Sequence, residues 1–240
     1  MKLQKLLSYT RQAVNDYQMI DEGDKIAVGV SGGKDSICLL IALAQLRRFF
    51  PYKFDIEAIT VSLGFPGSDY SSIKKLCESL NVRYTVVDTQ IGQIVFDERK
   101  EDNPCSLCAK MRKGALNSAA EELGCSKVAL GHNKDDVIET FMMSLIFEGR
   151  IGCFSPVSFL ERKSLYSIRP LIYVSEYETR SFAKGYGIVK NPCPADGSTK
   201  CQEIKELIRS LEKTYPNLNQ RIFGAVKRGL DDWKRGGENG

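Results

Sequence analysis

Residues 28–36 read Val-Gly-Val-Ser-Gly-Gly-Lys-Asp-Ser, and this stretch decides the fold expected of the 240-residue chain. A short apolar run at residues 25–30 precedes the glycine pair, and a stretch rich in good helix formers follows at residues 37–46. The glycines therefore occupy a strand-to-helix turn, where backbone N–H groups converge at the positive end of a helix dipole. Neither glycine carries a Cβ that would keep an anion away. We interpret the turn as a phosphate cradle, whose spacing matches neither a Walker A loop nor a dinucleotide fingerprint.

Strand-like and helix-like stretches alternate along the chain. This alternation predicts a doubly wound α/β fold with a mainly parallel, five-stranded sheet and ligands at the carboxyl ends of the strands. The expected strands are residues 25–30, 54–62, 83–87, 127–130 and 165–168. Helical additions are expected at both ends. We therefore expect an N-terminal helix at 1–22, a nucleotide-binding domain with a CxxC insertion at 23–190, and a C-terminal loop and helical extension at 191–240.

The composition limits the class of protein. Hydrophobic residues make up 42% of the chain, which is enough for a buried core. No apolar run reaches the length of about 18 residues that a membrane span needs, and the first residues show no signal peptide. We therefore expect a cytoplasmic protein without a membrane partner. The net charge of +4 permits a polyanionic partner without requiring one.

The eight cysteines of such a protein are expected to be metal ligands, redox thiols or core residues rather than disulfides. Asn-Pro-Cys occurs at residues 103–105 and again at 191–193, and the first copy opens a CxxC pair. Three interpretations stay open: a zinc site that recruits Cys201 as a fourth ligand, a redox dithiol, and an iron–sulfur cluster on three thiolates with one open iron. The remaining cysteines have contexts typical of core residues: Cys38, Cys77, Cys125 and Cys153.

A second polar cluster, residues 130–140, follows the fourth expected strand. It contains the single histidine of the chain, His132, on the rim of the sheet that also carries the phosphate cradle. Asp135 or Asp136 in this cluster could hold Mg²⁺, which nucleotide chemistry usually requires. The alternative is structural, because acidic residues also stabilise a helix N-terminus, and it is credible for one of the two aspartates.

Taken together, these motifs resemble those of the tRNA 2-thiocytidine synthetases, the TtcA family of PP-loop ATP pyrophosphatases. The resemblance extends over nearly the whole chain and is carried by residues 31–36, 105–116, 122–140, 168–176 and 191–198. It implies ATP, Mg²⁺ and a [4Fe-4S] cluster on Cys105, Cys108 and Cys193, and in many members a homodimer. Asp196 departs from the family, which often has another cysteine there, so this position cannot act as a thiol relay.

The resemblance implies a tRNA sulfurtransferase that adenylates the C2 oxygen of cytidine 32 in the anticodon loop and replaces that oxygen with sulfur. The sulfur would be held at the cluster and supplied by sulfide or a cysteine desulfurase. The alternatives are another tRNA base, a small-molecule substrate, or a nucleotide-binding iron–sulfur sensor without turnover. Catalysis is assigned to Asp35, Cys105, Cys108 and Cys193. Nucleotide binding is assigned to Ser31, Gly32, Gly33, Lys34, Asp35, Ser36, Val61, Gly131, His132, Asp135 and Asp136.

Basic residues at two places are candidates for contacts with RNA phosphates. Lys110, Arg112 and Lys113 stand beside the CxxC pair and so near the expected chemistry. Residues 200–240 hold nine Lys/Arg against six Asp/Glu, a net charge of +3. Two interpretations stay open for the basic residues of this stretch and its tryptophan: contacts along RNA phosphates, or an ordinary solvated helix face. The residues are Lys227, Arg228, Lys234 and Arg235, with Trp233.

Overall fold

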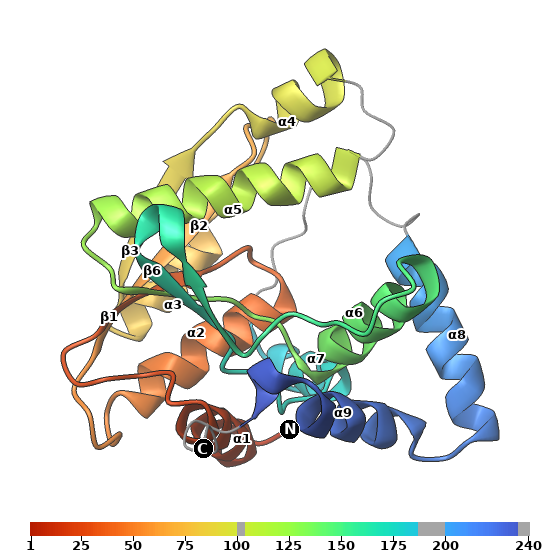
Figure 1. Cartoon of the computed structure of the whole chain (residues 1–240). Coiled ribbons are helices and arrows are strands. Elements are labelled where there is room, and N and C mark those ends of the chain that lie inside the picture. Colours follow the sequence, from red (N-terminus) through yellow and green to blue (C-terminus); the bar gives the residue numbers. More distant parts are fainter. Residues whose placement is uncertain (100–103, 187–199, 235–240) are drawn as a thin grey trace.

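The computed structural model of the chain describes residues 1–99, 104–186 and 200–234. Within these residues, six strands form one sheet in the order β3-β2-β1-β4-β6-β5, and every neighbouring pair is parallel except β5 and β6 (Figure 1). The strands are β1 (Lys25–Gly29), β2 (Asp55–Ser62), β3 (Arg83–Asp88), β4 (Lys127–Ala129), β5 (Val157–Leu160) and β6 (Leu165–Ile168). The predicted α/β class and the mainly parallel sheet are thus confirmed.

The predicted number of five strands is wrong, because β5 was missed. Its four residues are too few to show a periodic pattern, and its pairing partner β6 stabilises it across the short 3-10 turn Glu161–Lys163. Ser164 closes this turn with a φ of 48°, in the left-handed region that most residues avoid. The edge strand therefore depends on a hairpin that the local sequence hardly indicates.

The described part of the chain contains nine α-helices, of which the first precedes β1: α1 (Leu3–Asp16), α2 (Lys34–Leu46), α3 (Ser71–Ser79), α4 (Ile91–Gln93), α5 (Pro104–Glu122), α6 (Lys134–Phe147), α7 (Glu176–Ala183), α8 (Lys200–Thr214) and α9 (Leu218–Gly229). A π-helical turn, Ile94–Arg99, continues α4, and a 3-10 turn, Asp231–Trp233, follows α9. Within α5, the CxxC pair lies in the opening turns rather than in a preceding loop. Proline is well tolerated at the first helical position, so the helix can begin at Pro104.

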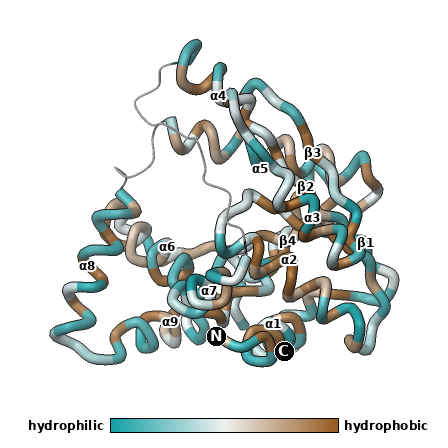
Figure 2. The backbone as a smooth tube through the Cα atoms, turned by 180° about the vertical axis from the view of Figure 1, so that it is seen from behind, coloured by the Kyte–Doolittle hydropathy of each residue, from teal (hydrophilic) through white to brown (hydrophobic). Residues whose placement is uncertain are grey.

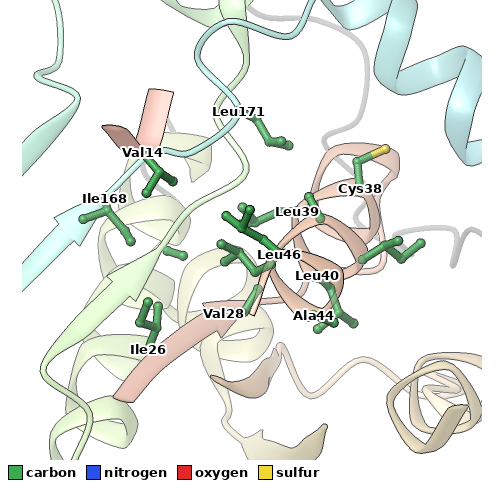
Figure 3. Close-up of a cluster of buried hydrophobic side chains, with 14 of the residues drawn as sticks. Val14, Ile26, Val28, Cys38, Leu39, Leu40, Ala44, Leu46, Ile168 and Leu171 are labelled. Carbon is green, nitrogen blue, oxygen red and sulfur yellow. The ribbon is translucent and has the colours of Figure 1, made fainter. Parts of the chain in front are cut away.

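Helices cover both faces of the sheet, as the doubly wound prediction requires. Ile26 and Val28 of β1 belong to the main core, which α1 and α2 also build, whereas Ala27 between them packs with Leu116 of α5 on the other face. Figure 3 shows part of the main core, in which residues of α2 such as Leu39 and Leu46 lie near Ile26 and Val28 of β1. Helix α2 is brown over most of its length in Figure 2, whereas α8 alternates teal and brown as a surface helix does.

Trp233 is a core residue, so its interpretation as an RNA contact is wrong. It is 1% exposed, lies edge-on to Tyr17 and Phe223, and donates a hydrogen bond from Nε1 to the Phe154 carbonyl. It thereby joins α1 to the end of α9, which lie together in Figure 1. The division of the chain at residues 22 and 190 stays a prediction. Among the described residues, no helix has the length and apolar character needed to cross a lipid bilayer.

Candidate nucleotide-binding site

The order of the strands creates a crevice at the centre of the sheet. The chain moves from β1 outwards through β2 to β3 and then returns to the other side of β1 as β4. At such a reversal the loops that follow two neighbouring strands diverge and leave a crevice at their carboxyl ends. Here these loops are the glycine-rich turn after β1 and the His132 segment after β4, as the sequence predicted for one rim of the sheet.

A pocket of about 460 Å³ occupies this crevice, beneath α5, and its volume is typical of small-molecule sites. Its lining has an apolar and a polar part. The apolar part consists of Gly29, Val30, Ile59, Val61, Ala109, Leu116, Leu130 and Gly131. The polar part consists of Ser31, Asp35, Ser36, Arg112, Lys113 and His132. A ligand with a flat apolar ring and an anionic chain fits this division.

The glycine-rich turn is held by its own serines. Gly32 has a φ of +82°, a conformation that residues with a Cβ rarely adopt. Ser36 donates a hydrogen bond from Oγ to the Gly33 carbonyl at 2.9 Å, and Ser31 Oγ lies 3.3 Å from Ser36 Oγ. Gly33 is the N-cap of α2, so the turn opens directly onto the first free N–H groups of that helix. This geometry suits a bound anion.

Asp35 receives hydrogen bonds from two other elements. Asn133 at the start of α6 donates from Nδ2 to Asp35 Oδ1 at 3.2 Å, and Thr179 of α7 donates from Oγ1 to the same oxygen at 2.5 Å. Asp35 Oδ2 lies 2.9 Å from the Lys34 ammonium. The carboxylate is therefore fixed at the pocket wall by contacts that join α2 to α6 and α7, which are far apart in the sequence.

Lys34 pairs with two carboxylates and does not itself line the pocket. Its ammonium lies 3.0 Å from Glu176 Oε1, in addition to the pair with Asp35. Burial alone would lower the pKa of Lys34, but the two carboxylates outweigh it and raise the pKa. Burial alone would raise the pKa of Glu176. The positive charges of Lys34, Lys205 and Arg180 outweigh it and lower the Glu176 pKa to about 2. Lys34 is thus a permanent cation that joins α2 to α7.

The segment after β4 presses against the phosphate loop. A Cβ at Gly131 would lie 3.1 Å from the Asp35 carbonyl carbon and 3.2 Å from the Ser36 backbone nitrogen. Next to it, the His132 ring packs against Phe154 with the centroids 4.8 Å apart. Burial, assisted by the positive charges of Arg169 and Lys113, lowers the pKa of His132 to about 4. The Nδ1 atom of this neutral ring is buried without a hydrogen-bond partner in the described part of the chain, which suits a group that a ligand satisfies.

Asp135 and Asp136 both have structural hydrogen bonds, and neither lines the pocket. Asp136 completes a capping box with Asn133, whose backbone N–H donates to Asp136 Oδ2 at 2.8 Å. Asp135 Oδ2 accepts a hydrogen bond from the Glu176 backbone N–H at 2.6 Å and so caps α7. Burial raises the pKa of Asp136 to about 6. Both aspartates therefore accept hydrogen bonds at a helix N-terminus, which is the structural alternative considered for them.

The residues present fit a bound Mg²⁺ through a different carboxylate. No group of three His, Cys, Asp or Glu side chains suited to a metal occurs in residues 1–99, 104–186 and 200–234. Mg²⁺ at phosphates needs only one or two carboxylates, because the substrate supplies the remaining oxygens. Among the described residues, Asp35 is the one carboxylate that lines the pocket. The assignment of Mg²⁺ to Asp135 and Asp136 stays a prediction without support from the pocket geometry.

The CxxC pair lies at the N-terminal end of the helix that roofs the pocket. Cys105 is half-buried, and Cys108 is 7% exposed in an apolar cluster with Leu63 and Val95. Residues three apart on a helix are neighbours, so both thiols can bind the same metal group. Arg112, which lines the pocket, follows Cys108 by one helical turn. The third cysteine of the expected set, Cys193, lies outside the described residues.

The sequence predicted nucleotide contacts for four of the six polar residues that line the pocket, Ser31, Asp35, Ser36 and His132, but missed most of the apolar lining. Leu116 follows Arg112 by one helical turn and so lies on the same face of the helix. This spacing is the sequence signal that could have placed Leu116 beside Arg112. Arg112 and Lys113, expected to contact RNA, line the nucleotide pocket, whereas Lys110 is exposed and outside the lining. Asn133 and Thr179, which hold Asp35, carried no signal because only the fold brings them there.

A glycine-rich anion turn at the switch point of a parallel sheet defines a nucleotide-binding α/β protein. The family model of the PP-loop domain matches residues 4–193. A relative from Pelobacter propionicus, named tRNA-cytidine(32) 2-sulfurtransferase, is 38% identical over 220 residues, covering 90% of this chain and 82% of the relative. A relative of the same name from Dechloromonas aromatica is 35% identical over 233 residues, covering 94% and 81%. The chain therefore belongs to the PP-loop family, in its tRNA-cytidine(32) 2-sulfurtransferase group.

Solved structures share the fold of this chain. The U34-tRNA thiolase NcsA from Methanococcus maripaludis, solved with its [4Fe-4S] cluster, is similar with a TM-score of 0.77 and 27% identity, over 94% of this chain and 77% of NcsA. An NAD⁺ synthetase from Burkholderia pseudomallei matches 95% of this chain and 90% of its own with a TM-score of 0.53 and 14% identity, and so shares the fold alone.

Proposed function

We propose that this chain is a tRNA sulfurtransferase that uses ATP to activate C2 of cytidine 32 in the anticodon loop and replaces the oxygen there with sulfur. One observation carries the proposal: the pocket combines the phosphate turn with α5, the helix that carries Cys105 and Cys108 at its N-terminus. The names of the sequence relatives support cytidine as the target base. The likeness to NcsA supports the cluster.

The lining of the pocket suggests how ATP binds. Its apolar part, with Ile59 and Leu116, offers a slot for the adenine ring, and the serines of the turn face the phosphates. We assign the β- and γ-phosphates to Ser31–Ser36 and the free N–H groups at the start of α2. Arg112 and Lys113 lie on the same pocket and can neutralise charge that develops on the α-phosphate, which is usually the largest catalytic contribution.

The chemistry follows from the poor reactivity of a ring carbonyl. The C2 oxygen of cytidine attacks the α-phosphorus of ATP, and pyrophosphate leaves. Sulfide sulfur then adds to C2, and AMP leaves with the former carbonyl oxygen. A [4Fe-4S] cluster on Cys105, Cys108 and Cys193 would supply an open iron at which the sulfur is held. The neutral His132 offers Nδ1 and its other ring nitrogen for hydrogen bonds without adding charge.

Further assignments belong to the same proposal. Gly32, Gly33 and Gly131 shape the turn, Lys34 fixes Asp35, and Asp35 is the carboxylate for Mg²⁺. Lys110, exposed beside the cysteines, is assigned to RNA. The sulfur comes from sulfide or from a cysteine desulfurase, the enzyme acts in the cytoplasm where its tRNA substrate is made, and a homodimer is its proposed state.

The experiment is anaerobic reconstitution with ATP, Mg²⁺, sulfide and unmodified tRNA, followed by nucleoside analysis. We expect 2-thiocytidine and one pyrophosphate for each sulfur inserted. NcsA, a U34-tRNA thiolase by name, makes a uridine the second candidate. Finding 2-thiouridine would favour that candidate, and finding no thionucleoside with a fully loaded cluster would favour a sensor without turnover.

A further inference from the structure

A second cavity, of about 560 Å³, lies on the other side of the segment that joins β4 to α6. His132 in this segment lines the nucleotide pocket, whereas Lys134, two residues later, lines the second cavity. Helices α1, α7 and α9 form its other walls and lie together in Figures 1 and 2. We call it the lysine–aromatic groove, because its lining includes Lys5, Lys134, Lys227, Tyr173, Tyr177 and Phe223.

The groove carries an excess of positive charge. Lys5 pairs with Glu178 at 2.7 Å, and Lys227 lies 3.4 Å from Asp16 and 2.7 Å from the Tyr173 hydroxyl. Lys134 lies over the Phe223 ring, 5.1 Å from its centroid, and has no carboxylate within salt-bridge distance in the described parts of the chain. Three ammonium groups thus face two carboxylates, and the excess resides on Lys134. A polyanion is the complementary ligand.

The groove also offers aromatic faces. Tyr177, the second residue of α7, is 81% exposed, and no ring packs against it among the described residues. Tyr173 and Phe223, which are partly buried in the same lining, stand edge-on with centroids 6.0 Å apart, and the Tyr173 hydroxyl donates to Asp16 at 2.8 Å. The inner rings are therefore fixed, while Tyr177 presents an open face. A positive groove with aromatic platforms is the arrangement that binds single-stranded nucleic acid, because every base has a face that can stack.

We propose that the lysine–aromatic groove binds an unpaired segment of the tRNA substrate, with a base stacked on Tyr177 and a phosphate at Lys134. This inference rests on the proposed function and extends it from the nucleotide pocket to a surface on which RNA is held. His132 lines the nucleotide pocket and Lys134 lines the groove, so RNA in the groove would lie next to the segment that contacts the nucleotide. An acidic peptide would satisfy the lysines but would leave the open ring of Tyr177 unused.

The test measures the affinity of the purified protein for unmodified tRNA by fluorescence anisotropy over a range of salt concentrations. Tyr177→Ala should weaken binding about tenfold, and Tyr177→Trp should restore it, because stacking requires only an aromatic face. Tyr215→Ala, which removes a tyrosine that is 54% exposed outside the groove, should bind tRNA as the unchanged protein does. Lys134→Ala should lower the slope of log affinity against log salt by about one unit or slightly less.

The outcomes separate the groove from the proposed function. If the unchanged protein binds tRNA, and Tyr177→Ala and Lys134→Ala both keep its affinity and salt slope, the groove is not an RNA site while the proposed function stands. A peptide partner in the groove gives this same result and overturns the inference. If the unchanged protein binds no tRNA, the proposed function fails and the groove inference fails with it. A parallel loss of ATP affinity in Tyr177→Ala would also overturn the inference, since a contact made only with RNA leaves ATP binding intact.

Discussion

Asp35 is the residue in which the phosphate turn, α6 and α7 meet. Its carboxylate binds Asn133, Thr179 and Lys34, so its position depends on three helices at once. The acidic residue after the lysine of the turn therefore both lines the pocket and holds the surrounding elements together. This double role explains why a Walker A arrangement, with a hydroxyl residue at that position, would not suit this site.

We predict that Asp35→Ala lowers the rate of pyrophosphate release by about 100-fold or more, because it removes a carboxylate for Mg²⁺ from a preorganised site. Its iron content should equal that of the unchanged protein. Thr179→Val keeps the side-chain shape but removes the hydrogen bond to Asp35, and should weaken ATP binding about fivefold to tenfold. Normal turnover of Asp35→Ala would show that the turn is wrongly assigned.

We predict that His132 stays neutral down to about pH 4, because burial excludes the charged ring from the site. The unfolded chain takes up this proton near pH 6.5, so the stabilisation that His132 gives is present above that pH and is lost as the pH falls towards about 4. As the chain has one histidine, its NMR signals report this titration directly. Lys113→Gln should raise the measured pKa, since it removes a nearby positive charge from an exposed position. A midpoint near 6.5 in the folded protein would contradict the prediction.

At the level of elements, the sequence was informative where a local pattern suffices. The strand, turn and helix around Ser31 to Ser36 follow from apolar runs and two glycines, and they were predicted within a few residues of their observed limits. No such local pattern indicates the start of α5, whose first turns pack through Cys108 against Leu63 and Val95 from other elements. The same holds for the π-helical turn Ile94–Arg99, since Val95 is buried in that cluster.

We predict that Gly131→Ala weakens ATP binding severalfold, because its new Cβ meets the backbone of Asp35 and Ser36, which cannot move without opening the turn. A matched glycine to alanine change is available on α5. Gly114 lies inside this helix, and a Cβ added there would enter open space, so Gly114→Ala should stabilise the protein by about 0.5–1 kcal/mol. ATP titration and thermal unfolding of both variants check the pair. Equal ATP affinities for the two variants would contradict the close packing at Gly131.

At the level of the whole molecule, the pocket is a product of strand order, which the sequence alone does not determine. Ile59 of β2, Leu130 after β4 and Leu116 of α5 meet only because β1 lies between β2 and β4. The sequence placed the turn and His132 on one rim but could not show that α5 passes over that rim. For this reason Arg112 and Lys113 were expected on RNA, although they lie on the nucleotide pocket.

The cluster prediction also concerns the whole molecule, because its three ligands come from distant parts of the chain. We predict that anaerobic protein is brown and contains about four irons per chain, bound by Cys105, Cys108 and Cys193. Cys105→Ala should lose the iron, whereas Cys77→Ala, in the core, should at most lower stability. Cys201 distinguishes a cluster from zinc, because a four-thiolate zinc site needs it and a cluster with an open iron does not.

Cys201 is exposed on the first turn of α8, with Sγ 3.6 Å from the sulfur of Met143, so its replacement should not disturb the core. Cys201→Ala should keep about four irons per chain and the visible absorption of an intact cluster, and it should still insert sulfur into tRNA. Metal analysis and absorption spectra of the four proteins, prepared anaerobically, provide the measurement. Stoichiometric zinc without sulfide in the unchanged protein, lost in Cys201→Ala, would establish the closed zinc site. Such a site has no open coordination position at which sulfur could be held beside the activated base.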